Sequence, residues 1–266
     1  RALAEEFGAE PFDDLRQLAV VTPSVLWIDR DAPLGEGERE ALESEDIAVV
    51  AGACTLPFLL AVPQCETAPS FRRMQSGRAL VSVAEAFGRV EVFQAAVAVP
   101  TAGHLSEGLR VAAASCLAVL GPIDLVTALG NRAGTLTATV IGARGFGTLA
   151  VGTGAEAASF ALVGEGGIAT VASGVVAWRR SDGSWVEETR LEPDGIEPTV
   201  QTLLEATAPR ESEAAAGDSD RRRFRLRIAA LADTIRLSAR TGHRESVETM
   251  LRGFEVDPDE LTPPTA

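Results

Sequence analysis

The first half of the chain alternates short apolar runs with polar stretches of helical character. Residues 24–29 form an apolar run that ends in an acid, and residues 47–51 form a second run; both are typical of buried strands. The charged stretch at 37–45 between them has the composition of an exposed helix. This order predicts a β-α-β unit with a parallel strand pair. Further helices are predicted at 78–88 and 106–120.

In the second half the pattern changes to short β-like runs separated by glycine-rich turns. These runs lie at 123–129, 136–141, 159–163, 168–172 and 175–179. The Ser-Asp-Gly-Ser segment at 181–184 predicts a tight hairpin between Trp178 and Trp185. The whole pattern predicts an α/β protein with a mixed sheet. Its N-terminal part is βαβ-like, its second half is antiparallel, and helices end the chain.

Residues 209–220 are mostly small or acidic, a composition typical of a linker between two parts of a chain. We expect an α/β body at 1–208, divisible into subdomains at 1–120 and 121–208, and a helical segment at 221–266. Apolar residues in that last segment recur at helical spacing: Phe224, Ile228, Leu231 and Ile235. This C-terminal helix is expected either to pack on the body or to hold a homo-oligomer or a partner protein.

The residue types that the chain lacks exclude several kinds of chemistry. There are 24 arginines against 38 acids, a net charge of −14, no lysine, no tyrosine and one asparagine. A chain without lysine has no Schiff-base lysine, no pyridoxal-phosphate anchor and no Walker-type phosphate loop. Two isolated histidines and three cysteines build neither a HExxH site nor a four-cysteine zinc site, so no metal ligands are predicted.

Net charge and amino-acid composition indicate the kind of source organism and the kinds of partner. Scarce lysine, asparagine and tyrosine indicate a GC-rich genome, and the acid excess is typical of a salt-loving, halophilic organism. We therefore expect a cytoplasmic protein of a halophilic or a high-GC prokaryote. No apolar run is long enough to cross a membrane. The acidic charge disfavours nucleic acid, except at the basic cluster from Arg221 to Arg227, which could also contact an acidic protein surface.

Glycines concentrate in residues 137–148, after a predicted strand. Such a turn lets backbone N–H groups approach a phosphate closely. A Rossmann-type interpretation places Gly142, Gly145 and Gly147 in a dinucleotide-binding turn. Glu165, at the end of the next strand, would then contact a ribose. The spacing is GxxGxG rather than GxGxxG, and the helix that should follow contains glycines. Tight turns of an antiparallel sheet explain the segment equally well.

The same segment carries a second resemblance. Gly142-Ala143-Arg144, a helix-length gap and then residues 161–168 resemble the core of diadenylate cyclase domains. That family has a Gly-(Thr/Ala)-Arg-His loop that opens a helix, followed by a strand that ends in Ser-Glu. By this resemblance Asp124 stands where the family has its metal-binding Asp. Arg144 would be the loop arginine, and Glu165 the acid after the third strand.

Departures from that family imply that the cyclase activity is lost. Leu125 replaces a glycine, Gly145 the loop histidine and Gly164 the serine. The resemblance therefore implies a nucleotide-binding sensor or regulatory domain without catalysis, whose ligand is a nucleotide with or without Mg²⁺. The residues expected to line its pocket are Asp124, Gly142, Arg144, Gly145, Gly147, Thr148 and Glu165.

Two alternatives stay open. An NAD(P)-dependent oxidoreductase domain would need a proton donor, for which His104 is the main candidate. A scaffold protein without a small-molecule site would instead show a large exposed apolar face. Cys54 follows a buried strand, as the cysteine loops of Asp/Glu racemases do, but a buried structural thiol is the simpler interpretation. Asp29 and Asp31 fit either a ligand-binding strand end or a solvated turn.

Overall fold

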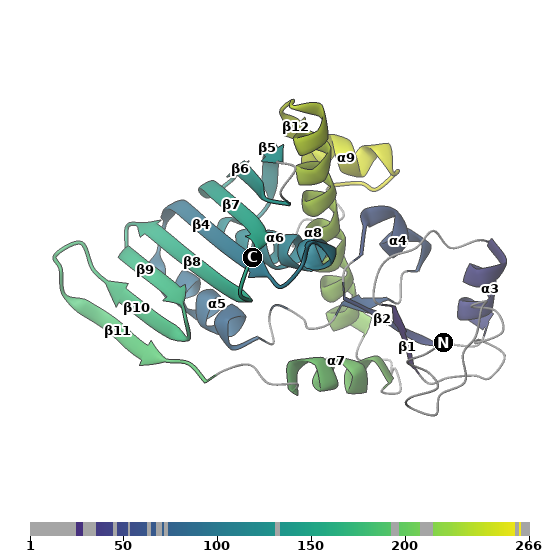
Figure 1. Cartoon of the computed structure of the whole chain (residues 1–266), viewed down its shortest axis with the longest axis horizontal. Helices are drawn as coiled ribbons and strands as arrows, with labels where there is room; N and C mark the ends of the chain where they lie inside the picture. The colour runs from purple at the N-terminus through teal and green to yellow at the C-terminus, as the bar shows by residue number, and fades with distance from the viewer. Residues whose placement is uncertain are drawn as a thin grey trace.

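The chain folds into two sheets, a small one and a large one, linked by helices (Figure 1). The computed structural model describes residues 25–28, 36–44, 47–52, 54–62, 65–67, 71, 74–130, 134–192, 197–207, 215–258 and 261. The candidates Asp29 and Asp31 lie outside these residues.

The small sheet is parallel and has the order β1-β2-β3. Its strands are β1 (Val25–Ile28), β2 (Ala48–Ala51) and β3 (Glu66–Thr67). Helix α3 (Glu36–Ser44) connects β1 to β2, and the short helix α4 (Leu56–Ala61) follows β2. The predicted β-α-β unit with a parallel strand pair is confirmed. Val49, Val50 and Ala51 are fully buried, as the continuous apolar run indicated.

The large sheet is mixed and has the order β11-β10-β9-β8-β4-β7-β6-β5-β12. Its strands are β4 (Val90–Val99), β5 (Ile123–Gly130), β6 (Leu136–Gly142), β7 (Gly145–Thr153), β8 (Ala157–Gly164), β9 (Gly167–Ala172), β10 (Val175–Arg179), β11 (Trp185–Arg190) and β12 (Glu245–Ser246). All neighbours pair antiparallel except β4 and β7. The predicted α/β class, with a mixed sheet and antiparallel strands in the second half, is therefore confirmed.

The predicted hairpin at 181–184 joins β10 to β11. The carboxylate of Asp182 accepts hydrogen bonds from the backbone N–H of Ser184 at 2.8 Å and from its hydroxyl at 2.6 Å. These bonds lower the pKa of Asp182. Gly183 takes a positive φ of 85°, which the turn requires and which glycine adopts without strain.

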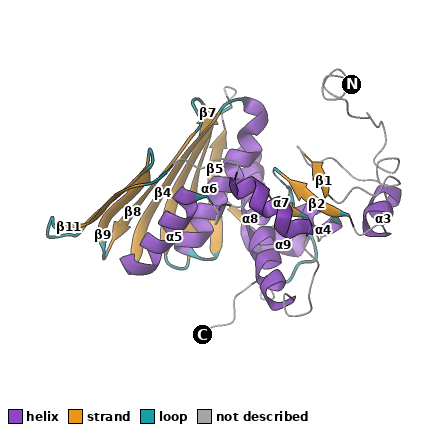
Figure 2. Ribbon diagram, turned by 90° about the horizontal axis from the view of Figure 1, so that it is seen from below, coloured by secondary structure: helices purple, strands orange, loops and turns teal. Residues whose placement is uncertain are grey.

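Four helices cover one face of the large sheet, and none of the described helices lies on the opposite face (Figure 2). The covering helices are α5 (Gln75–Phe87), α6 (Leu105–Leu120), α8 (Ala215–Thr241) and α9 (Val247–Gly253). Helix α8 also contacts α4, and α7 (Glu197–Thr207) packs on the small sheet. The long helix α8 thus connects the two sheets (Figure 1).

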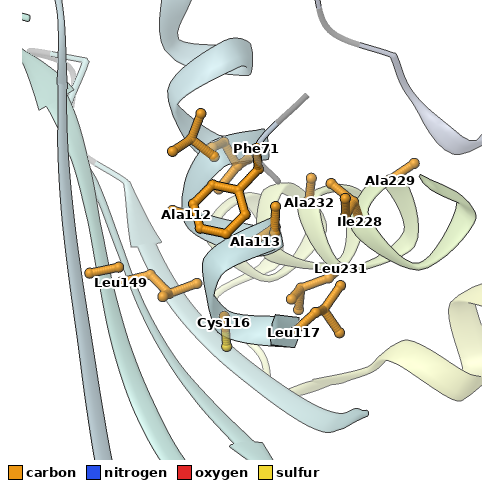
Figure 3. Close-up of a cluster of buried hydrophobic side chains, with 14 of the residues drawn as sticks. Phe71, Ala112, Ala113, Cys116, Leu117, Leu149, Ile228, Ala229, Leu231 and Ala232 are labelled. Carbon is orange, nitrogen blue, oxygen red and sulfur yellow. The ribbon is translucent and has the colours of Figure 1, made fainter. Parts of the chain in front are cut away.

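Small side chains let α6 lie close to its neighbours. A Cβ atom on Gly108 would come within 2.8 Å of Val99 and 2.9 Å of Val151, so α6 approaches β4 and β7 closely at this residue. On its other side α6 meets α8 through alanines, among them Ala113 and Ala232 (Figure 3). Alanines and aliphatic residues therefore fill the contact between α6 and α8, while phenylalanines such as Phe93 and Phe160 are buried elsewhere in the same core.

The C-terminal helix begins earlier than expected. Helix α8 starts at Ala215, so residues 215–220 of the expected 209–220 linker form the beginning of this helix. Residues 208–214 lie outside the described residues. Its apolar side packs on β5 and α6. Ser238 also donates from its hydroxyl to the carbonyl of His243 at 2.5 Å and accepts from the amide of Ala128 at 2.9 Å. Within the described part of the chain, no helix is long and apolar enough to cross a membrane.

Candidate functional site

The glycine-rich segment forms the β6–β7 hairpin, and no helix follows it. Gly142 pairs with Gly145 across the turn. A Cβ atom on Gly142 would come within 2.7 Å of the Pro122 carbonyl oxygen, and one on Gly145 within 2.7 Å of the Val90 carbonyl oxygen. Both glycines are thus required by the close approach of neighbouring backbone. The strand-turn-helix layout of a dinucleotide-binding loop is not formed here.

The other residues predicted to bind a nucleotide spread over several parts of the large sheet. Asp124 is exposed on β5, opposite the end of β6. Arg144 lies in the β6–β7 turn and lines a hollow of about 370 Å³ together with Arg89. Glu165, in the β8–β9 turn, accepts a hydrogen bond from the Arg89 amide at 3.3 Å. Thr148 is half-buried on β7, where it pairs with Gln94 and Thr139.

The structure therefore places Gly142, Arg144 and Gly145 in the same turn, between β6 and β7. Glu165 lies in the β8–β9 turn beside Arg89, and Thr148 lies among the central strands. Gly147 is buried on β7. Nucleotide binding by these residues stays a prediction. The described residues hold no group of three or more His, Cys, Asp or Glu side chains that could bind a metal ion.

A second site, not recognised from the sequence, lies where the two sheets meet. A small cavity there is enclosed by the loop after β2, by α4, by the first turns of α6 and by α8. Its lining residues are Cys54, Leu59, Ser106, Arg110, Arg225, Ile228, Ala229, Ala232 and Arg236. The cavity adjoins the carboxyl end of β2, the edge at which α/β folds bind their ligands.

Two of the cavity's three arginines already have acidic partners. Arg225 forms an ion pair with Glu66 and donates to the carbonyl of Cys65 at 2.7 Å. Arg236 pairs with Asp233 at 2.7 Å, and Asp233 also accepts the amide of Leu56 at 2.7 Å, at the first residue of α4. These contacts fix the position of α8 relative to the small sheet.

The third arginine, Arg110, is 5% exposed, and its Nε has no hydrogen-bond partner. Burial lowers the pKa of this guanidinium, an effect opposed by the nearby Cys54 and Glu107. The sequence contains a feature that could have pointed to this residue. Arg110 is the one charged residue in the stretch 108–120, which otherwise consists of small and apolar residues.

Two thiols flank the same region. The sulfurs of Cys54 and Cys65 lie 3.6 Å apart, and both residues are buried. The contact with Cys54, together with burial, raises the pKa of Cys65, so the nucleophilic thiolate is disfavoured. Cys116 is buried within α6, and burial raises its pKa as well. The interpretation of Cys54 as a buried thiol is confirmed.

His104 stands at the start of α6, two residues before Ser106, which lines the cavity. Its Nδ1 lies 2.8 Å from the hydroxyl of Thr101, and the ring is half-buried. This contact orients the imidazole. The second histidine, His243, is exposed beyond the end of α8.

Comparison with known proteins shows the fold. No family model and no curated protein matches the chain. Among solved structures, an oxidoreductase from Agrobacterium radiobacter in complex with NAD⁺, L-tartaric acid and magnesium is 14% identical, covering 94% of this chain and 88% of its own, with a TM-score of 0.67. Levoglucosan dehydrogenase in complex with NADH is 15% identical, covering 92% and 86%, with a TM-score of 0.69. An oxidoreductase from Thermotoga maritima is also 15% identical, covering 94% and 87%, with a TM-score of 0.69.

The chain has the fold of these oxidoreductases. The predicted resemblance to diadenylate cyclases is wrong, and with it the predicted function as a cyclase-derived sensor. The physical reason is local: Gly142-Ala143-Arg144 should open a helix in a cyclase, and here it ends β6 and turns into β7. The glycine pattern reflects strand packing rather than a phosphate loop.

Proposed function

We propose that the chain binds a nicotinamide dinucleotide and acts as an NAD(P)-dependent oxidoreductase. The supporting observation is the extent of the likeness: 92% of the chain and 86% of levoglucosan dehydrogenase, in its complex with NADH, match each other. The cofactor, when bound, accepts or donates the hydride. The chain's own residues then need to hold it, to orient a substrate and to move a proton.

The residues at the edge of the small sheet fit one end of such a cofactor. The parallel strands β1 and β2 end side by side, and the Gly52 amide donates to the carbonyl of Ile28 at 3.3 Å. Gly52 and Cys54, which follow β2, are both small and buried, and Cys54 lines the cavity beside this edge. The α4 N-terminus is closed to phosphate, because the carboxylate of Asp233 already binds the Leu56 amide. We therefore place the nicotinamide end at this edge, and the described residues contribute no turn for the pyrophosphate.

His104 is the proposed proton carrier. It is one of two histidines in a chain without lysine or tyrosine, and it stands at the start of α6, beside the cavity. We expect His104→Ala to lower NAD⁺ reduction about 100-fold, since general acid–base groups contribute at least this much. His243→Ala, the matched control, should leave the rate unchanged. The readout is NADH absorbance with L-tartrate and levoglucosan as trial substrates; equal rates for the two variants would remove His104 from the mechanism.

A thermal-shift comparison tests the proposed function. NADH or NADPH at one hundred times its Kd should add about 2.7 kcal/mol to the free energy of unfolding. For a chain of this size the melting temperature then rises by roughly 5–10 °C. ATP and cyclic di-AMP serve as controls and should give no shift. A shift with cyclic di-AMP alone would contradict the proposal.

We also propose that the chain forms a homodimer through the open face of the large sheet. Helix α8 buries its apolar side within the chain, so the interface is placed on the uncovered strands instead. A hollow of about 600 Å³ runs along this face, and none of its lining residues is charged although the chain carries a net charge of −14. The lining includes Ala96, Thr139, Ala150, Ser159 and Thr170.

A second copy is the occupant that fits this face. An uncharged surface is complementary to itself, whereas two acidic surfaces repel each other. Six strands from β9 to β5, spaced about 4.8 Å apart and about 23 Å long, span roughly 650 Å². This approaches the roughly 800 Å² per partner of stable interfaces.

We expect light scattering to give twice the chain's 27.8 kDa mass. Thr139→Arg, which places a charge at the centre of the face, should give the mass of a single chain. Ser181→Arg, in the exposed β10–β11 turn, is the control and should remain a dimer. A monomeric unmodified chain, or a dimer that tolerates Thr139→Arg, would rule out this interface.

A further inference from the structure

The cavity between α6, α8 and the loop after β2 contains an uncompensated charge. Arg110 is 5% exposed and lines the cavity, its Nε has no hydrogen-bond partner, and no carboxylate among the described residues forms an ion pair with it. Guanidinium stays protonated in proteins. A buried charge without a partner costs several kcal/mol, so this arrangement requires a counter-charge from elsewhere.

The neighbouring charges do not supply it. Arg225 and Arg236, which line the same cavity, add positive charge, and their carboxylate partners Glu66 and Asp233 are already engaged. Glu107 raises the pKa of Arg110, but by less than burial lowers it. Among the described residues, three arginines and no carboxylate therefore line the cavity itself.

The start of α6 adds to this positive charge independently. His104 is the N-cap residue, and its side chain makes no capping hydrogen bond. Its Nδ1 is instead paired with the hydroxyl of Thr101. The Leu105 amide donates to the Ala102 carbonyl, and the N-cap side chain accepts none of the following amides, which form the positive end of the dipole of this 16-residue helix. Ser106, in that turn, faces the same cavity as Arg110.

The size of the cavity limits what can enter it. There is room of about 10 Å³ for the centre of a water-sized sphere, which corresponds to about one water molecule or one small ion. A phosphate or a larger acid does not fit. A halide or the carboxylate of formate matches both the size and the positive surroundings.

We propose that this cavity, lined by Arg110 and Ser106, is a binding site for one small monovalent anion, a halide or a formate-sized carboxylate. The anion neutralises Arg110 and joins α6 and α8 to the loop that follows β2. Because that loop begins at the edge where the nicotinamide is placed, anion binding also orders one wall of the proposed cofactor site.

The test is thermal unfolding of the whole chain at constant ionic strength. Sodium gluconate, whose anion is too large for the cavity, is replaced stepwise by sodium chloride or sodium formate. We expect a saturating rise in the melting temperature, about 3–5 °C at ten times the Kd. A rise with chloride alone identifies a halide site, and a rise with formate alone identifies a carboxylate site. Equal melting temperatures in all three salts would overturn the proposal.

Arg110→Met, which keeps the length of the side chain without its charge, should abolish the rise. Arg252→Met, which removes an exposed arginine of α9, should keep it. A rise that survives Arg110→Met places the anion elsewhere. If Arg110→Met does not fold, crystals of the unmodified chain grown in sodium bromide decide: an anomalous peak beside Arg110 supports the site, and density for water alone removes it. NADH binding is measured separately, in sodium gluconate. Failure of the anion proposal can therefore be distinguished from failure of the proposed cofactor binding.

Discussion

Phe160→Ala should lower the free energy of unfolding by about 3–5 kcal/mol, the usual cost of truncating a fully buried aromatic residue. Phe160 is 2% exposed on β8, and its ring lies 5.9 Å from Phe71, edge to face, and 6.4 Å from Phe93, stacked. These three rings contact one another in the core, separately from the second aromatic pair, Phe87 with Trp178, so truncating the central ring leaves a cavity that fixed neighbours cannot fill.

Urea unfolding followed by circular dichroism measures this effect. Thr189→Ala is the control, because Thr189 is exposed on the edge strand β11 of the same sheet, away from the aromatic cluster. Its change should stay within about 0.5 kcal/mol. A loss of less than 1 kcal/mol for Phe160→Ala would show that this aromatic cluster is not packed as described.

The second large effect is expected at Arg225, which ties α8 to the small sheet. Its side chain is 8% exposed and pairs with Glu66, which is 26% exposed, while it also donates to the Cys65 carbonyl at 2.7 Å. Arg225→Ala removes both contacts and leaves a partly buried carboxylate unpaired. We expect a loss of about 3 kcal/mol, at the lower end for a broken buried ion pair because Glu66 keeps some contact with water.

Arg223→Ala is the control for Arg225. Arg223 pairs with Asp220 on the exposed side of the same helix, with exposed fractions of 37% and 74%, so its removal should cost less than about 0.5 kcal/mol. A second readout is the rate at which a thiol reagent modifies Cys65, which should rise in Arg225→Ala. Equal stabilities of the two variants would show that Arg225 does not anchor the small sheet.

Most helices and strands were predictable because buried apolar residues recur along each of them at a regular spacing. The apolar run of β2 is continuous because parallel strands are buried on both faces, and the runs at 123–129 and 136–141 alternate as half-exposed antiparallel strands do. Strand β7 was missed as a strand. Its glycines favoured a phosphate loop, although Phe146, Thr148 and Ala150 already alternate with the buried residues between them.

The candidate site could not be predicted in the same way. Cys54, Arg110 and Arg225 come from three separate segments, and nothing in their local sequence says that they share one cavity. A glycine in the sequence also does not reveal why a side chain is missing there. At Gly142 the missing side chain makes room for the backbone of Pro122, and in a nucleotide-binding loop it would make room for a phosphate. Only the pairing of β6 with β7 distinguishes a hairpin from a phosphate loop. The likeness to oxidoreductases, at 14–15% identity, rests on the fold rather than on short motifs.

Binding of a nicotinamide dinucleotide can be measured without a substrate, by calorimetric titration with NADH and NADPH. We expect saturable binding of one dinucleotide per chain, with NAD⁺ or NADP⁺ competing for the same site. No heat of binding up to millimolar concentrations, from a chain whose circular dichroism shows it to be folded, would mean that this fold does not bind the proposed cofactor.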